Sequence, residues 1–155
     1  EEKYVIIDIT KEGTTEVEVE DNINNETIVN IETYLIVYNS VNATGSMPSQ
    51  IKLKDQPIEI LENRFVKEGY TFINWNTSSS YTGTEYNGGD SYTANASTTL
   101  YANWKDTSAP IINDVYLSTN WVAGNDVKLK IDATDNIAVT GYQITTTNAE
   151  PTSWR

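Results

Sequence analysis

Strict alternation of apolar and polar side chains in two short segments is the strongest constraint on the fold of this chain. In residues 16–20, Val17 and Val19 stand between glutamates. In residues 127–134, the apolar positions are Val127, Leu129, Ile131 and Ala133. Successive side chains of a β-strand point to opposite faces, so a period of two predicts strands that bury one face. We therefore expect a mainly β fold.

Residues 1–32 predict a small acidic meander. The segments 4–9, 16–20 and 27–31 have the length and composition of strands, and the polar residues 21–25 mark a turn. This part of the chain carries ten acidic residues and two lysines. A meander of this size is marginally stable in water by itself. We expect it to pack on a neighbouring module or to be the tail of a preceding one.

The middle of the chain predicts the element order β-β-α-β-β. Its expected strands are residues 34–38, 50–54, 71–76 and 100–104. The helix is expected at residues 57–67, where Pro57 suits the first turn of a helix. The apolar residues that would share one face of this helix are Ile60, Leu61 and Phe65. An α+β module is therefore expected between two β segments.

Four blocks in this middle part carry a family resemblance. They are Tyr-Leu-Ile-Val-Tyr-Asn at 34–39, Gly-Ser-Met-Pro-Ser-Gln at 45–50, Glu-Gly-Tyr-Thr-Phe-Ile-Asn-Trp-Asn-Thr at 68–77 and Thr-Leu-Tyr-Ala-Asn-Trp at 99–104. In sequence and order they resemble the Listeria–Bacteroides repeat, the B-repeat of internalins and many bacterial surface proteins. The chain departs from that repeat at residues 42–44, where Asn-Ala-Thr replaces its Asn-Gly-Gly turn.

The resemblance implies a β-grasp, ubiquitin-like fold for residues 33–106 and a role in display or adhesion. It also implies that Trp75 and Trp104 belong to the hydrophobic core, although two tryptophans could instead form a platform on which sugars stack. Proteins that carry such repeats are expected outside the bacterial cell, in the cell wall or on the cell surface.

Residues 107–155 carry a second resemblance. The alternating strand at 127–134 is accompanied by Ala-Pro-Ile at 109–111 and Pro-Thr-Ser-Trp at 151–154. Together these resemble the first half of a bacterial Ig-like domain. Such a sandwich needs roughly seven strands and about 100 residues, whereas 49 residues follow residue 106 (155 − 106). We expect half of a sandwich that continues beyond residue 155, and three domains overall: 1–32, 33–106 and 107–155.

Composition narrows the function. The chain has no cysteine and no histidine, which removes thiolate and imidazole ligands and the usual general base. Its net charge of −12 repels the phosphate backbone of nucleic acids. No apolar run reaches the roughly 18 residues that a membrane helix needs. A glycosidase pair among the 22 acidic residues would need a cleft, which modules of this size rarely enclose. We expect no enzyme, no cofactor, no nucleic-acid partner and no insertion of this segment into a membrane.

Three groups of residues are candidates for binding. Loop tyrosines suited to ligand contact are Tyr81, Tyr86 and Tyr92. Oxygen ligands that calcium could use are Asp132, Asp135 and Asn136, although they lack EF-hand order and suit a turn whose side chains bind backbone amides. Acidic residues that could bind cations or a basic partner are Glu16, Glu18, Glu20 and Asp21, although we interpret them as a solvated strand face. We assign no metal ligand and no catalytic residue.

The leading hypothesis is a non-catalytic module of a secreted or wall-attached bacterial surface protein, acting as a stalk, an adhesion module or a protein-interaction repeat. Its partner would be a host or matrix protein, bound along an exposed sheet edge. The alternative is an accessory glycan-binding module of an extracellular polysaccharide-active enzyme. In that case the partner would be a glycan bound through the loop tyrosines.

Overall fold

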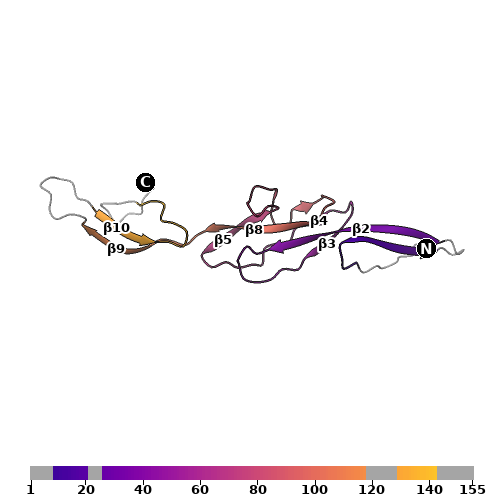
Figure 1. Ribbon diagram of the computed structural model, residues 1–155, viewed down its shortest axis with the longest axis horizontal. Helices are drawn as coiled ribbons and strands as arrows, with labels where there is room; N and C mark the ends of the chain where they lie inside the picture. The colour runs from indigo at the N-terminus through magenta and orange to yellow at the C-terminus, as the bar shows by residue number, and fades with distance from the viewer. Residues whose placement is uncertain (1–8, 21–25, 118–128, 143–155) are drawn as a thin grey trace. The chain divides into compact units, whose positions relative to one another are not determined.

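The computed structural model describes residues 9–20, 26–117 and 129–142. The chain divides into two compact units, Glu1–Lys105 and Asp106–Arg155. Figure 1 shows the strands of both units along the chain.

The first unit is built on a six-stranded mixed sheet in the order β1-β2-β8-β5-β6, with β3 also paired to β2. Its strands are β1 (Gly13–Glu20), β2 (Glu26–Asn39), β3 (Gln50–Leu53), β5 (Tyr70–Asn76), β6 (Glu85–Tyr86) and β8 (Thr98–Asp106). A separate two-stranded sheet joins β4 (Ile58–Glu59) and β7 (Ser91–Tyr92). The expected strands at 16–20, 34–38, 50–54, 71–76 and 100–104 all correspond to strands here. The segments 4–8 and 21–25 lie outside the described residues.

Strand β2 connects the acidic N-terminal part to the middle of the chain. Its first half pairs antiparallel with β1, from Glu20↔Glu26 to Gly13↔Thr33. Its second half pairs antiparallel with β3 and parallel with β8, where the register runs from Ile36↔Thr98 to Asn39↔Tyr101. The strands expected separately at 27–31 and 34–38 are therefore one continuous strand of 14 residues.

The prediction of a helix at residues 57–67 is wrong. This segment is loop apart from β4 and a single bridge at Val66, and it uses its backbone groups in tertiary hydrogen bonds: Ile60 N–H donates to the Asp90 carbonyl, and Val66 N–H donates to the Thr44 carbonyl. The Asn63 side chain also accepts a hydrogen bond from the Phe65 N–H at 2.9 Å. An α-helix needs the same backbone donors for bonds to the residue four positions earlier, so the two arrangements exclude each other.

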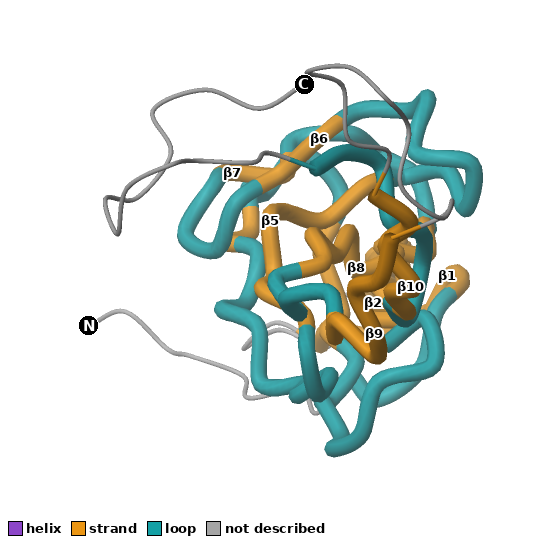
Figure 2. The backbone as a smooth tube through the Cα atoms, turned by 90° about the vertical axis from the view of Figure 1, so that its left-hand side faces the viewer, coloured by secondary structure: helices purple, strands orange, loops and turns teal. Residues whose placement is uncertain are grey.

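The described residues contain strands, turns and loops but no helix (Figure 2). The expectation of a mainly β chain is thus confirmed, whereas the α element of the expected β-grasp is not seen. The six-stranded sheet is mixed and open, and the two-stranded sheets are antiparallel. It follows that no described helix is long and apolar enough to cross a membrane.

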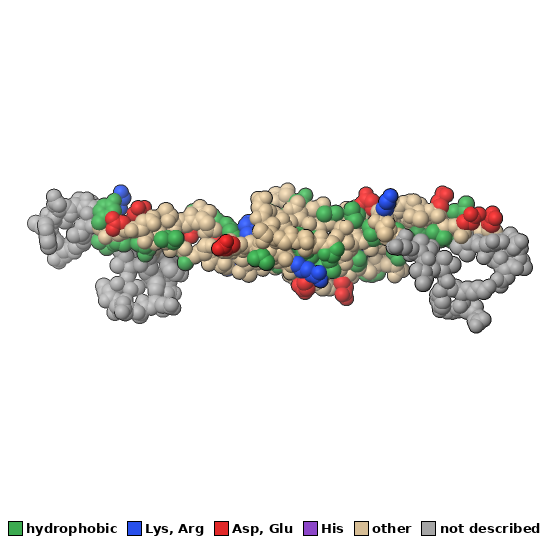
Figure 3. Space-filling view, turned by 90° about the horizontal axis from the view of Figure 1, so that it is seen from below, with side chains coloured by type: hydrophobic (Ala, Val, Ile, Leu, Met, Phe, Trp, Pro, Cys, Tyr) green, Lys and Arg blue, Asp and Glu red, His purple; other side chains and the backbone are tan. Residues whose placement is uncertain are grey.

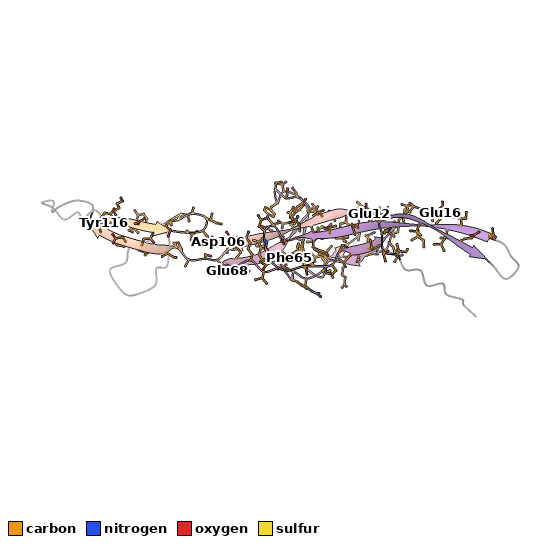
Figure 4. All side chains as sticks on the ribbon, turned by 60° about the horizontal axis from the view of Figure 1, so that its bottom comes forward. Glu12, Glu16, Phe65, Glu68, Asp106 and Tyr116 are labelled. Atoms are coloured by element: carbon orange, nitrogen blue, oxygen red, sulfur yellow. The ribbon has the colours of Figure 1, made fainter. Side chains whose placement is uncertain are left out.

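The hydrophobic core of the first unit gathers around Trp75, whose side chain is 0% exposed. The rings of Tyr38 and Phe72 meet the Trp75 ring edge-on, each with centroids 4.9 Å apart, and Phe72 continues the contact to Trp104 at 5.6 Å. The buried apolar residues are Ile36, Tyr38, Ile60, Phe65, Trp75, Tyr92, Leu100 and Ala102. Figure 4 shows Phe65 within this body of packed side chains. The core position expected for Trp75 is confirmed.

The turn that departs from the family pattern has a left-handed backbone. Val41 and Asn42 have φ angles of 50° and 63°. The Asn39 side chain accepts a hydrogen bond from the Val41 N–H at 2.9 Å and so holds the turn. Asparagine tolerates this backbone region, whereas a β-branched valine is strained in it.

The second unit contains β9 (Ile111–Leu117) and β10 (Leu129–Thr134), which form an antiparallel pair with a bulge at Asp132/Ala133. The expected amphipathic strand is therefore present over its described part. The expected half of an Ig-like sandwich finds no support here, because the described residues of this unit form a single two-stranded sheet.

Candidate functional site

A polar loop between β5 and β6 is a candidate binding surface of the first unit. Asn76 ends β5 with its side chain fully buried, and its Oδ1 accepts hydrogen bonds from Ser78 N–H at 2.9 Å and Gly83 N–H at 3.0 Å. Thr77 and Thr84 close the loop, because Thr77 N–H donates to the Thr84 carbonyl and Thr84 N–H donates to the Thr77 hydroxyl. The loop is held by a buried amide at its base.

Glycine is required at position 83 of this loop. A Cβ there would lie 2.3 Å from Thr77 Oγ1 and 2.9 Å from Asn76 Oδ1. Any side chain would therefore displace the groups that hold the loop closed. The sequence contains one signal for this site, a glycine between two threonines after an expected strand. The reason for the glycine is visible only in the structure, where it lies against the buried Asn76 side chain.

The outer side of the loop carries a row of hydroxyl groups beside a tyrosine. Ser78 Oγ lies 2.8 Å from Ser80 Oγ, which lies 3.0 Å from Thr82 Oγ1. Tyr81 is 37% exposed and adopts a φ of 59°. Its hydroxyl donates to the Ala102 carbonyl at 3.4 Å. Hydroxyls next to an exposed aromatic ring can form hydrogen bonds and stacking contacts with a polar ligand such as a sugar.

The three tyrosines expected to contact a ligand have different environments. Tyr92 is 4% exposed, and its hydroxyl donates to the Ala96 carbonyl at 2.9 Å. Burial also raises the pKa of Tyr92. Its expected position on the surface is therefore wrong, because the ring is part of the core. Tyr86 is half-buried and meets Tyr92 edge-on, with centroids 5.7 Å apart. Tyr81 is the exposed member of the three.

The two tryptophans do not form an exposed platform. Trp75 is enclosed by the core, and its indole N–H donates to the Leu61 carbonyl at 3.0 Å. Trp104 is partly buried and donates to the Ser40 carbonyl at 3.0 Å. Each indole N–H is satisfied by the backbone, as a structural role requires.

Acidic side chains lie along the β1–β2 hairpin. The register places Glu16 opposite Asn30 and Glu18 opposite Ile28, on the same face as Glu32. Glu16 and Glu18 are exposed, which agrees with a solvated strand face. Figure 3 shows acidic side chains gathered over this hairpin, and Figure 4 places Glu12 and Glu16 along it. Asp21 lies outside the described residues.

One ion pair stands where this hairpin meets the rest of the sheet. Lys54 Nζ lies 2.6 Å from Glu32 Oε1. The hydrogen bond from Lys54 lowers the pKa of Glu32, and the same contact raises the pKa of Lys54. The Ser97 hydroxyl joins the hairpin to the start of β8, because it accepts from Leu35 N–H at 2.9 Å and donates to Glu12 at 3.0 Å.

The acidic residues of the second unit form a turn. Asp135 Oδ1 accepts hydrogen bonds from Ile137 N–H at 2.9 Å and Ala138 N–H at 3.2 Å, as expected for a turn residue. Asn136 donates to Asp106 at 3.2 Å, and the Ser108 N–H bond lowers the pKa of Asp106. Over residues 9–20, 26–117 and 129–142, no three acidic, histidine or cysteine side chains group as metal ligands would. An open hollow of about 450 Å³ in this unit includes Asp106 and Asp135.

Sequence patterns missed one further polar cluster. Lys52 of β3 is buried, and its ammonium contacts Asn95 in the loop before β8. In an alternating strand, a lysine between Ile51 and Leu53 is predicted to face solvent. Burial of that position depends on the loop that covers it, which no local pattern reveals.

Residues 34–103 match the Listeria-Bacteroides repeat domain. This match covers the first three sequence blocks of the middle part and the fourth up to Asn103, and it spans the second half of β2 to most of β8. No curated protein and no solved structure matches the chain. The match supports the prediction of a repeat that is typical of bacterial surface proteins. It gives no support to the prediction of an Ig-like domain after the repeat.

Proposed function

We propose that this chain is a non-catalytic part of a secreted or wall-attached bacterial surface protein, and that its repeat module acts as a stalk segment or adhesion repeat. The module would comprise residues 33–106, preceded by the acidic hairpin. The repeat domain at 34–103 is typical of bacterial surface proteins. The absence of histidine and cysteine from the sequence agrees with a role without catalysis.

The observation that carries the stalk proposal is the parallel pairing of β2 with β8. The repeat begins in β2 and ends in β8, so the two strands that connect it to the rest of the chain are hydrogen-bonded neighbours. Tension on the two ends would pull these strands in opposite directions along their axes. All ladder hydrogen bonds would then be loaded together, which favours resistance to unfolding under force.

Glycan binding is the second candidate, and the loop between β5 and β6 favours it. An exposed Tyr81 beside the hydroxyls of Ser78, Ser80 and Thr82 offers the stacking and hydrogen-bonding groups that a sugar needs. Tyr92 cannot contribute directly from its buried position.

Retention on immobilised glycans separates the two candidates. The full chain would be tested on laminarin, xylan and mucin glycans, beside the variants Tyr81→Ala and Ile73→Ala. Ile73 is a matched control, because it is an exposed apolar residue of β5 outside the loop. The stalk proposal predicts no retention of any of the three proteins. Retention that is lost in Tyr81→Ala and kept in Ile73→Ala would replace the stalk by a glycan-binding module.

A further inference from the structure

Within the described residues, Lys52 is a buried cation that has no carboxylate partner. Its side chain is 1% exposed, although it carries an ammonium group. Its Nζ donates to the Leu53 carbonyl at 3.1 Å and to Asn95 Oδ1 at 2.9 Å, and it lies 5.6 Å from the centre of the Tyr34 ring. The ion pair found in the described part of the chain belongs to its neighbour Lys54. Removing an ammonium from water without an opposite charge is unfavourable, so packing alone does not explain this arrangement.

Asp55 contacts both ends of the Asn95 carboxamide. The Asp55 N–H donates to Asn95 Oδ1 at 2.9 Å, and Asn95 Nδ2 donates to Asp55 Oδ1 at 2.6 Å. Asp55 adopts a φ of 59°, which bends the chain directly after β3. Both ends of the amide are therefore fixed, with the carbonyl oxygen turned toward the lysine.

The distances place the amine close to the amide carbon. Nζ lies 2.9 Å from Asn95 Oδ1, and a C=O bond is about 1.23 Å long. Nζ is therefore no more than about 4.1 Å from Asn95 Cγ, near the separation of about 3–3.5 Å from which bond formation proceeds.

We propose that Lys52 and Asn95 become joined by an intramolecular isopeptide bond, with Asp55 as the positioning residue. The inference is independent of the stalk proposal. It concerns a modification site formed by three residues that lie on β3, on the turn after β3 and in the loop before β8.

The reaction needs no oxidant and no cofactor. The Lys52 ammonium first loses one proton, which the released ammonia takes up in solvent at the end. The resulting neutral ε-amine attacks Asn95 Cγ, a C–N bond forms, and the carbonyl electron pair moves onto Oδ1. The Asp55 N–H already donates to that oxygen and stabilises the developing negative charge. Nζ then loses a proton, the amide nitrogen gains one, and ammonia leaves with the electrons of the broken C–N bond. The Asp55 carboxylate contacts this nitrogen and is placed to relay the proton. Asp55 and Asn95 lie at the surface, so ammonia can escape to solvent.

The bond would close a covalent ring across the first unit. Lys52 and Asn95 are 43 positions apart in sequence. A cross-link of this span restricts the unfolded chain strongly. It would fasten β3 to the segment that leads into β8.

The mass of the intact chain tests the proposal. The purified full chain should be lighter than its sequence mass by one ammonia molecule. Trypsin should fail to cut after Lys52 and should yield residues 12–54 joined to residues 68–105, as sequencing by tandem mass spectrometry would show. Lys52→Met keeps the apolar stem and removes the nucleophile, so this variant should have its full sequence mass. Asn95→Ala should also have its full mass.

Lys54→Met is the matched control, because this neighbouring exposed lysine lies outside the cluster. It should still lose one ammonia. A wild-type chain of full sequence mass would overturn the proposal. A loss of ammonia that persists in Lys52→Met would overturn it as well, and would assign the loss to cyclisation at the Asn87-Gly88 pair. The joined peptides from the wild-type chain decide the matter even if a variant does not fold.

Discussion

The indole N–H of Trp75 donates a hydrogen bond of 3.0 Å to the carbonyl oxygen of Leu61. The bond joins the C-terminal end of β5 to a segment that has no strand pairing of its own at this point. It satisfies a polar group inside the core and fixes the path of residues 60–65 across the sheet. Ile60 and Phe65, on either side of Leu61, are both buried. The largest side chain of the core thus determines the course of the segment that covers it.

Truncation of this side chain should therefore destabilise the first unit severely. We expect Trp75→Ala to lower the free energy of unfolding by about 3–5 kcal/mol, because it leaves a cavity and an unpaired carbonyl. Urea unfolding of the full chain followed by far-ultraviolet circular dichroism measures the change. Ile73→Ala is the control, since Ile73 is 48% exposed on the same strand. Wild-type stability in Trp75→Ala would show that Trp75 is not a core residue.

The left-handed turn after β2 gives a second prediction. Asn42 is exposed and has a φ of 63°. Asn42→Val should destabilise the chain by about 1–2 kcal/mol, because a β-branched side chain clashes in this backbone region. Asn42→Gly should remain within about 0.5 kcal/mol of the wild type. Ser46 is exposed and has no positive φ, so Ser46→Val should also change the free energy of unfolding by no more than about 0.5 kcal/mol. Equal effects of Val and Gly at position 42 would contradict the backbone assignment.

Stability should depend on pH through the Glu32–Lys54 pair. The folded-state pKa of Glu32 is lowered by its hydrogen bond to Lys54, so its contribution is present above the ordinary glutamate value and is lost as pH falls through the folded value. The folded-state pKa of Lys54 is raised, so its contribution is lost only in strongly alkaline solution. The wild type should therefore exceed Glu32→Gln in stability near neutral pH and lose this advantage in acid. Urea unfolding over a pH series measures the difference, and an advantage that persists in strong acid would contradict it.

Calcium should not be needed for folding. Asp135 already accepts two backbone hydrogen bonds in a turn, and it lies outside any grouping of ligands in the described residues. Thermal melts in EDTA and in calcium should give the same Tm. A Tm that rises with calcium, and does so no longer in Asp135→Ala, would reveal a site at this turn.

Local sequence patterns predicted the strands whose buried and exposed residues follow from the sequence of that strand alone. Alternation around Val17 predicted β1, and the block around Trp75 predicted β5 and its buried tryptophan. The sequence did not predict that two expected strands form the single strand β2, because the polar residues Glu32 and Thr33 interrupt the apolar run. Thr33 is buried, and its single hydroxyl proton is shared between the carbonyls of Lys11 and Gly13 across the hairpin.

The failures have a common physical cause. Ile60, Leu61 and Phe65 also fit an extended chain that reaches across a core, because spacing alone does not reveal where backbone hydrogen bonds go. The Lys52–Asn95–Asp55 cluster was invisible for the same reason. Its members meet through contacts 40 and 43 positions apart in sequence. Tertiary contacts, and not local composition, determine both the path of residues 60–65 and the burial of Lys52.

Stretching single molecules tests the stalk account most directly. The chain has no cysteine, so pairs of cysteines can be introduced as attachment points without interference. Attachment at Glu26 and Lys105 pulls β2 and β8 in opposite directions along their axes, whereas attachment at Asn39 and Lys105 separates the same two strands from one end. The account predicts a clearly higher unfolding force in the first geometry, because its hydrogen bonds break together and not one after another. Equal forces in the two geometries would contradict a role for the β2–β8 pair in bearing tension.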